Sequence, residues 1–261
     1  GNENAYYTSA VITNNAQWNR LRLASVFSKQ LKKISLSAHQ QVLNNAQKIY
    51  YTGGLSGKFK ASEARHIGFS LNKVVRLPTL NELFWYQPGY ALGNPDLKPV
   101  FNDKYVFGTS LGDTFTFEAY YKRYKNNFFE LPLQDNLDNV IIYTPINIDS
   151  TEEIGFDFEA YLNITSRWFL SLGTSIYKIR DTNSFSGSTI QLSQWSNYTD
   201  LTNNVSLLKD KSLTATLSVV YLGENVYGLQ TSRERWDTYL TMSKTLLKDN
   251  AVISLSVSDL F

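Results

Sequence analysis

Hydrophobic and polar residues alternate along most of this chain with a period of two, and helical periodicity is nearly absent. The clearest stretch is 153–162, in which Ile, Phe, Phe, Ala and Leu share one face, opposite Glu153, Asp157 and Glu159. Stretches 34–39, 214–221 and 253–258 repeat the pattern. A charge at the centre of a bilayer costs roughly 2–4 kcal/mol, so in a membrane these acidic side chains must line water. A soluble sheet with one exposed face shows the same alternation, so the pattern predicts strands without choosing between the two settings.

The connections between the expected strands fall into two kinds, which alternate along the chain. Short polar connections lie at 30–33, 111–114, 163–167, 209–212 and 248–250. Long irregular stretches are expected at 76–100, 126–151, 181–203 and 223–235. In an up-and-down sheet this places all short turns at one rim and all long loops at the other, which is the asymmetry of outer-membrane barrels. Strands of about 9–13 residues fit a tilted membrane crossing. The sequence therefore predicts an all-β fold, an antiparallel up-and-down transmembrane β-barrel with about twelve strands present.

Composition excludes several classes of function. The chain has no cysteine, which removes disulfides, thiolate zinc sites and cysteine nucleophiles. The net charge of +2 gives no argument for nucleic acid. The only histidines, His39 and His66, fall on polar faces without a carboxylate at ligand spacing, so no metal site and no cofactor are expected. No Ser-His-Asp order, nucleophile elbow or phosphate-binding loop is present, so no enzyme is expected.

Two motifs carry a resemblance to a known family. Arg76 opens the stretch RLPTLNELFW, and Gly93 opens GNPDLKP, which is followed by Val100. In this order and spacing the pair resembles TonB-dependent outer-membrane receptors, although that family usually has Glu where Val100 stands. The segment PINI at 145–148 with the following GFD at 155–157, and VSDLF at 257–261, also resemble the family. The resemblance spans about residues 18–261 and implies roughly the second half of a 22-stranded barrel.

The resemblance implies a transport function in the bacterial outer membrane. Residues 1–261 are expected to be the C-terminal portion of the receptor barrel, with the N-terminal plug and the final strand absent. Such a receptor binds a scarce solute, cobalamin or a ferric siderophore, at its extracellular loops for energy-coupled import. The implied partners are TonB acting through the absent plug, the small-molecule ligand, membrane lipid and lipopolysaccharide, and a surface lipoprotein. Two alternatives stay open: a self-contained outer-membrane barrel acting as an enzyme or pore, and a soluble carbohydrate-binding or adhesive β-domain.

The expected extracellular loops supply the candidate ligand-binding residues. In the stretch 76–100, aromatic rings are suited to stacking on a flat ligand such as a corrin or a catecholate. Against this, the prolines of that stretch stiffen it, and its aromatics can simply pack on one another. Arg76 can instead hold loop carbonyls or a plug carboxylate. The predicted ligand-binding residues are Arg76, Trp85, Tyr86, Tyr90, Trp195 and Tyr227.

Overall fold

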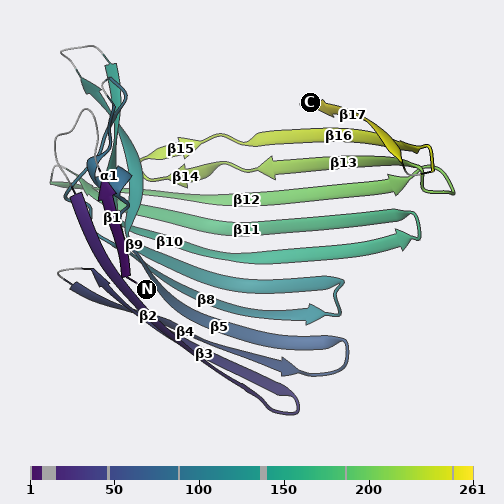
Figure 1. Cartoon of the computed structure of the whole chain (residues 1–261), viewed down its shortest axis with the longest axis horizontal. Coiled ribbons are helices and arrows are strands. Elements are labelled where there is room, and N and C mark those ends of the chain that lie inside the picture. Colours follow the sequence, from purple (N-terminus) through teal and green to yellow (C-terminus); the bar gives the residue numbers. More distant parts are fainter. Residues whose placement is uncertain are drawn as a thin grey trace.

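The chain forms one large, strongly curved antiparallel sheet (Figure 1). This computed structural model describes residues 2–7, 16–45, 48–87, 89–135, 140–185, 187–248 and 250–260. Its strands are β1 (Asn2–Tyr7), β2 (Ala16–Gln30), β3 (Ile34–Asn45), β4 (Lys48–Lys60), β5 (Arg65–Arg76), β6 (Tyr86–Gln87), β7 (Ala91–Leu92), β8 (Val100–Leu111), β9 (Phe115–Asp135), β10 (Val140–Thr165), β11 (Trp168–Phe185), β12 (Ser188–Ser206), β13 (Leu213–Leu222), β14 (Asn225–Tyr227), β15 (Gln230–Ser232), β16 (Arg235–Leu246) and β17 (Ala251–Ser258).

The long strands follow one another across the sheet in sequence order, each antiparallel to the next. The short strands β6 and β7 lie off this path, and β14 pairs with β15 in a separate two-stranded sheet. The predicted antiparallel up-and-down architecture is confirmed. The sheet is open, because β1 and β17 stand at its two edges and do not pair with each other among the described residues. In Figure 1 the short turns lie at the right, and the rim with α1 (Leu80–Phe84) lies at the left.

The two faces of the sheet differ in chemistry. Residues directly opposite each other on neighbouring strands point to the same side, so the register defines each face. On the convex face Phe117 stands opposite Phe158, and Phe156 stands next to them, with the rings of Phe117 and Phe156 stacked at 5.8 Å. Phe156 is 51% exposed and Ile176, in the same row, is 52% exposed. Exposed apolar patches of this extent are rare on soluble monomers and mark a surface in contact with lipid.

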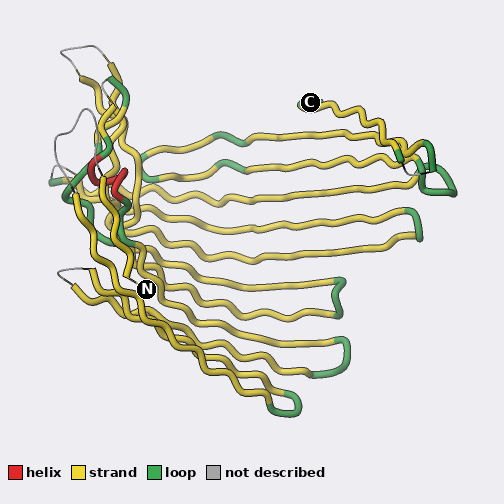
Figure 2. Tube along the Cα trace, viewed as in Figure 1, coloured by secondary structure: helices red, strands yellow, loops and turns green. Residues whose placement is uncertain are grey.

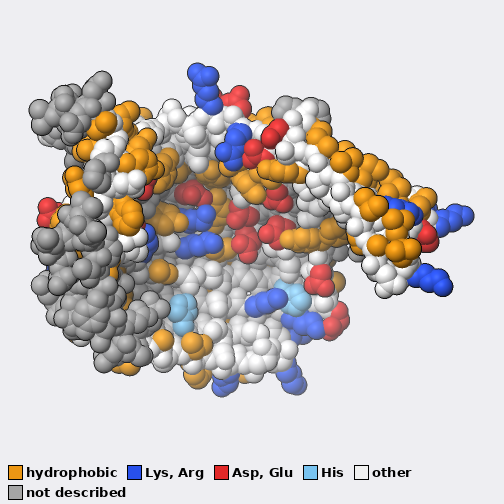
Figure 3. Space-filling model, turned by 45° about the horizontal axis from the view of Figure 1, so that its top comes forward, with side chains coloured by type: hydrophobic (Ala, Val, Ile, Leu, Met, Phe, Trp, Pro, Cys, Tyr) orange, Lys and Arg blue, Asp and Glu red, His pale blue; other side chains and the backbone are white. Residues whose placement is uncertain are grey.

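The concave face is polar and charged. Lys122 forms an ion pair of 2.8 Å with Glu153, and Ser175 donates a hydrogen bond of 2.6 Å to Asp157. Figure 3 shows acidic and basic side chains gathered in the middle of the hollowed face. The acidic face predicted for residues 153–162 therefore does line the interior, as water-facing side chains of a membrane barrel must.

The prediction of irregular loops at 126–151 and 181–203 is wrong. β9 and β10 pair from Phe115 opposite Ala160 up to Asp135 opposite Val140, with one interruption at Asn126, whose φ is 56°. β11 and β12 likewise pair up to Phe185 opposite Ser188, and Figure 2 shows these strands continuing into the rim. Above the membrane both faces meet water, so the hydrophobic alternation fades although the backbone ladder persists. The strands, at up to 26 residues, consequently exceed the expected 9–13.

The alternation of short and long connections is also less strict than the sequence suggested. Asn45 pairs with Lys48, so the connection between β3 and β4 at the loop rim is as short as the turns at the other rim. The stretch between β5 and β8 is long, as expected, and contains the five-residue helix α1. Within the described residues no helix is long and apolar enough to cross a membrane.

Candidate functional site

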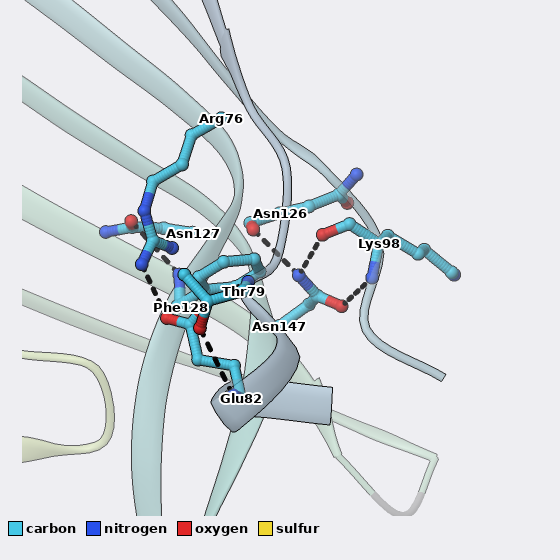
Figure 4. Close-up of polar contacts among 8 residues, drawn as sticks. All are labelled: Arg76, Thr79, Glu82, Lys98, Asn126, Asn127, Phe128 and Asn147. Atoms are coloured by element: carbon cyan, nitrogen blue, oxygen red, sulfur yellow. Dashed lines mark hydrogen bonds and ion pairs between the residues drawn. The ribbon is translucent and has the colours of Figure 1, made fainter. Parts of the chain in front are cut away.

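The connection between β5 and β8 is built around a capped helix. Thr79 and Glu82 form a capping box: the Thr79 amide donates to Oε2 of Glu82 at 2.7 Å, and the Glu82 amide donates to Oγ1 of Thr79 at 3.2 Å. Arg76, the last residue of β5, pairs with Oε1 of Glu82 and lies 4.5 Å from the centre of the Phe128 ring (Figure 4). The RLPTLNE stretch therefore makes a closed network within its own loop and against β9.

This network stabilises the ionised form of the Glu82 carboxyl. Partial burial alone would raise the pKa of its carboxyl, but the hydrogen bonds from Thr79 and Arg76 and the charge of Arg76 outweigh burial, so the pKa lies below its ordinary value. Glu82 is therefore ionised at neutral pH and neutralises Arg76. The guanidinium is thus already paired before any ligand arrives. Its partner is the Glu82 carboxylate of its own loop, rather than the loop carbonyls or plug carboxylate that were expected.

Asn147 of β10 fastens the second half of the connection to the barrel wall. Its side-chain Oδ1 accepts from the Lys98 amide at 2.8 Å, and its Nδ2 donates to the carbonyl oxygens of Lys98 at 2.9 Å and Asn126 at 2.8 Å (Figure 4). Asn94 donates from Nδ2 to the carbonyl oxygen of Pro145 at 3.0 Å. Residues of the GNPDLKP motif are therefore hydrogen-bonded to residues of the PINI motif, and we call this set of bonds the clamp.

The clamped loop, the upper parts of β9 and β10, and the β14–β15 hairpin enclose a cavity of about 780 Å³. This volume lies within the range of about 300–1,000 Å³ typical of small-molecule sites. Its aromatic lining comes from three places along the chain: Trp85 and Tyr90 from the loop, Tyr124, Phe128, Phe129 and Tyr143 from the barrel wall, and Tyr227 from the hairpin. Its charged lining residues are Arg76, Glu82 and Glu130. The cavity is therefore suited to holding an extended apolar or π-surface rather than a dense negative charge.

The β14–β15 hairpin is fixed over one side of the cavity. The ring of Tyr227 meets Phe129 edge-on at 5.3 Å, and the Gly228 amide donates to Oδ2 of Asp181 at 2.7 Å. Gly228 has a φ of 64°, which favours glycine, and a Cβ there would lie 2.3 Å from the Phe129 ring.

The structure brings four of the six predicted ligand residues together. Arg76, Trp85, Tyr90 and Tyr227 all line the cavity. Tyr86 begins β6 next to this set but is not among the lining residues. Trp195 lies away from the cavity: it stands opposite Lys178 on the convex face and is 59% exposed. Its position fits an aromatic belt at a membrane interface instead.

Sequence reasoning missed the residues that the barrel wall contributes. Phe128, Phe129 and Tyr143 were placed within a supposed irregular loop, whereas β9 and β10 carry them to the cavity as strand residues. The signal was present as the consecutive aromatics at 128–129. The register of β9 and β10 places them opposite Ile146 and Asn147 of the PINI motif. Among the described residues, no group of three or more His, Asp or Glu side chains is placed to hold a metal ion.

Comparisons with known proteins agree with this architecture. The family described as "Outer membrane protein beta-barrel family" matches residues 54–261. A comparison with curated protein sequences finds no match.

Several solved structures share the fold at low sequence identity. A variant of the ferric enterobactin receptor of Pseudomonas aeruginosa matches with a TM-score of 0.64 and 14% identity, over 94% of this chain and 40% of that one. The siderophore receptor PirA of the same organism gives 0.65 and 10%, over 94% and 49%. The iron transporter FrpB of Neisseria meningitidis gives 0.67 and 12%, over 94% and 41%. The chain thus spans less than half the length of each of these three proteins.

Proposed function

Because the chain belongs to the outer membrane protein beta-barrel family, whose matched region includes most of the sheet, we propose that it is the ligand-binding part of an outer-membrane uptake receptor. The solute is bound from the extracellular side in the cavity lined by Arg76, Trp85, Tyr90 and Tyr227. In the complete receptor, TonB acting through a plug domain drives the import of this solute. The proposal rests on one observation above all: residues far apart in the sequence meet in one aromatic cavity at the loop rim.

The cavity's construction supports binding rather than loose loop packing. Its loop wall is held by the capping box of Thr79 and by the hydrogen bonds of Asn147, so the backbone that carries Trp85 and Tyr90 is fixed before the ligand enters. A site that is already ordered loses less conformational entropy on binding, and this raises affinity. Proteins that share the fold include two siderophore receptors and an iron transporter, and two variants of the ferric enterobactin receptor have been solved in complex with enterobactin.

The proposed solute is cobalamin or a ferric siderophore, and the charge of the cavity bears on the choice. Arg76 is its cation among the described lining residues, and Glu82 already neutralises it. Glu130 adds a further negative charge, so the lining carries no excess positive charge. A strongly anionic ferric catecholate would meet an unfavourable field here, whereas cobalamin or an uncharged ferric siderophore would not. The charge therefore favours a solute without net negative charge.

Binding to the purified full-length protein in detergent tests the proposal. Cyanocobalamin and ferric enterobactin are titrated separately against the wild type and against Trp85→Ala, which removes one aromatic wall. Alanine substitution of an aromatic side chain that stacks on a flat ring costs about 1–3 kcal/mol where nucleic-acid bases are bound. A similar loss here would lower the affinity about 5- to 150-fold. Trp236→Ala is the matched control, because Trp236 is 56% exposed on the convex face.

The outcomes separate the candidate functions. Saturable binding of either solute, weakened by Trp85→Ala and unchanged by Trp236→Ala, supports a receptor. The solute that binds then identifies the class of solute, cobalamin or ferric siderophore. Binding of neither solute, nor of an uncharged ferric hydroxamate, contradicts the proposal. A chain that purifies as a soluble monomer without detergent would instead support the carbohydrate-binding alternative, and that outcome would overturn the membrane receptor as well.

A further inference from the structure

A row of charged side chains crosses the convex face of the sheet, directly above its apolar band. Arg123 of β9 stands opposite Glu152 of β10, and Glu152 stands opposite Arg180 of β11. One step closer to the short turns, the residues of these strands on the convex face are Tyr121, Ile154 and Lys178. On the other side of Arg123 the row continues through Asp103 of β8, which pairs with Lys73 of β5 at 3.9 Å, so it holds three positive and two negative charges. Most side chains below it on the convex face are apolar, so the row requires an explanation.

The height of the row on the barrel agrees with a membrane interface. Leu162 is the last apolar residue on the convex face of β10 before the register with β11 shifts between Asn163 and Thr165, and Glu152 lies ten residues from it. At about 3.3 Å per residue this is roughly 33 Å along the strand, or about 25 Å along the membrane normal for a tilt of about 40°. That equals the roughly 25 Å apolar band of outer-membrane barrels. The row therefore lies at the polar edge of the bilayer, where a charge costs little, and on the side of the longer loops.

The guanidinium groups of the row are open to a further partner. Nε of Arg123 lies 3.8 Å from Oε1 of Glu152, and Nη1 of Arg180 lies 3.7 Å from Oε2. Both distances are those of ion pairs but exceed a hydrogen bond. Oε1 of Glu152 instead accepts a hydrogen bond of 3.2 Å from the Tyr121 hydroxyl. Within the described chain neither guanidinium makes a hydrogen bond, and the arginine side chains are 55% and 47% exposed.

The local charge favours an anion. With Lys73 and Asp103 included, the row has three positive and two negative side chains, which leaves one excess positive charge. Lys125 and Lys178 add positive charge one step above and below the row on the same face. Neighbouring strands are about 4.8 Å apart, so Arg123 and Arg180, two strands apart, are separated by about 10 Å at the backbone. Two long guanidinium side chains starting at that distance are able to converge on one phosphate and to bind it through paired hydrogen bonds.

We propose that Arg123 and Arg180 bind a phosphate group of lipopolysaccharide, on its lipid A part, in the outer leaflet around the barrel. The apolar side chains below the row contact the acyl chains, and Glu152 holds the two arginines apart and side by side. This site lies on the opposite face of the sheet from the solute cavity. It is therefore independent of the proposed uptake function.

Binding of defined lipid A to the full-length protein in detergent tests this assignment. Native mass spectrometry compares diphosphorylated lipid A with the same lipid after removal of both phosphates. We expect the wild type to bind the diphosphorylated form at least tenfold more tightly, and Arg123→Gln with Arg180→Gln to lose that preference. The matched control is Lys58→Gln with Lys104→Gln, which removes the same number of positive charges from the concave face and should leave the preference unchanged.

A second variant keeps the test sharp if the arginine variant folds poorly. Glu152→Gln removes the negative charge between the arginines and should tighten binding of diphosphorylated lipid A about threefold or more, which a loss of folding cannot mimic. Equal binding of the two lipids by the wild type contradicts the proposal, as does a control variant that loses the preference too. Displacement of the lipid by an equal concentration of inorganic phosphate would also overturn it, since the site would then bind phosphate rather than the lipid.

Discussion

Replacing Asn147 by alanine should release the long connection between β5 and β8 from the barrel wall. The side chain makes three hydrogen bonds of 2.8, 2.9 and 2.8 Å, two of them to the backbone of Lys98. A neutral hydrogen bond contributes about 0.5–1.5 kcal/mol net, so the three together contribute about 3 kcal/mol in a dry setting. Because Lys98 is exposed, water replaces part of this, and about 1.5–3 kcal/mol is expected to be lost.

Hydrogen exchange measures this loss directly. The Lys98 amide should exchange about 10–100 times faster in Asn147→Ala, because an opening free energy lowered by 1.4 kcal/mol corresponds to a tenfold faster exchange. Asn147→Asp should not rescue protection, since a carboxylate still accepts from the Lys98 amide but faces two carbonyl oxygens without a proton to donate. Asn163→Ala, at the turn end of the same strand, is the control. An unchanged Lys98 exchange rate in Asn147→Ala, or wild-type behaviour of Asn147→Asp, would refute the clamp.

Three further outcomes follow from the geometry. Gly228→Ala should loosen the β14–β15 hairpin and speed trypsin cleavage between β13 and β16 at least tenfold, because its Cβ would lie 2.3 Å from a phenylalanine ring. The control is Gly89→Ala, which should change cleavage little, since Gly89 also has a positive φ of 68° but has no atom within 4 Å of the added Cβ. Equal effects of the two substitutions would argue against the clash. The lowered pKa of Glu82 means that its contribution to loop stability is complete above the ordinary value of 4.5 and is lost as the pH falls through the lower folded value. Protection of the loop amides from hydrogen exchange should therefore drop at pH 3 in the wild type, and in Glu82→Gln it should already be low at pH 7. Unchanged protection of the wild type at pH 3 would contradict the Arg76–Thr79–Glu82 network. Fluorescent labels on single cysteines in Phe156→Cys and Asp157→Cys should differ in quenching in the membrane-bound protein. The label at 156 should be quenched by lipid-soluble quenchers and the label at 157 by water-soluble ones. Equal quenching at both positions would contradict a sheet with one lipid-facing and one water-facing side.

The hydrophobic pattern predicted the strands correctly where one face of the strand meets water and the other is apolar. Residues 153–162 alternate clearly because the bilayer acts on one face alone, and the register of β10 confirms the acidic side as the interior. The same reasoning failed at 126–151, because above the bilayer both faces of β9 and β10 meet water and the alternation disappears while strand pairing continues. Periodicity therefore reports the membrane-embedded part of a strand rather than its full length.

The candidate site could be predicted from its loop but not from its walls. Arg76, Trp85 and Tyr90 were found because they lie in a recognisable stretch between two strands. Phe129 and Tyr143 could not be found, since only the three-dimensional pairing of β9 with β10 carries them to the cavity. Trp195 shows the converse limit: an aromatic residue in an expected loop was placed by strand register on the lipid-facing side.

Protection of cysteines by the solute tests most directly whether the aromatic cavity is the binding site. The chain contains no cysteine, so Tyr90→Cys and Tyr227→Cys place single thiols on two separate walls of the cavity, and Trp195→Cys places one outside it. Cells carrying each full-length variant are treated with a membrane-impermeant maleimide, with and without saturating solute. The account predicts that cyanocobalamin or an uncharged ferric siderophore slows labelling at both cavity positions at least tenfold and leaves Trp195→Cys unaffected. Equal labelling at Tyr90→Cys and Tyr227→Cys with and without each solute would contradict it.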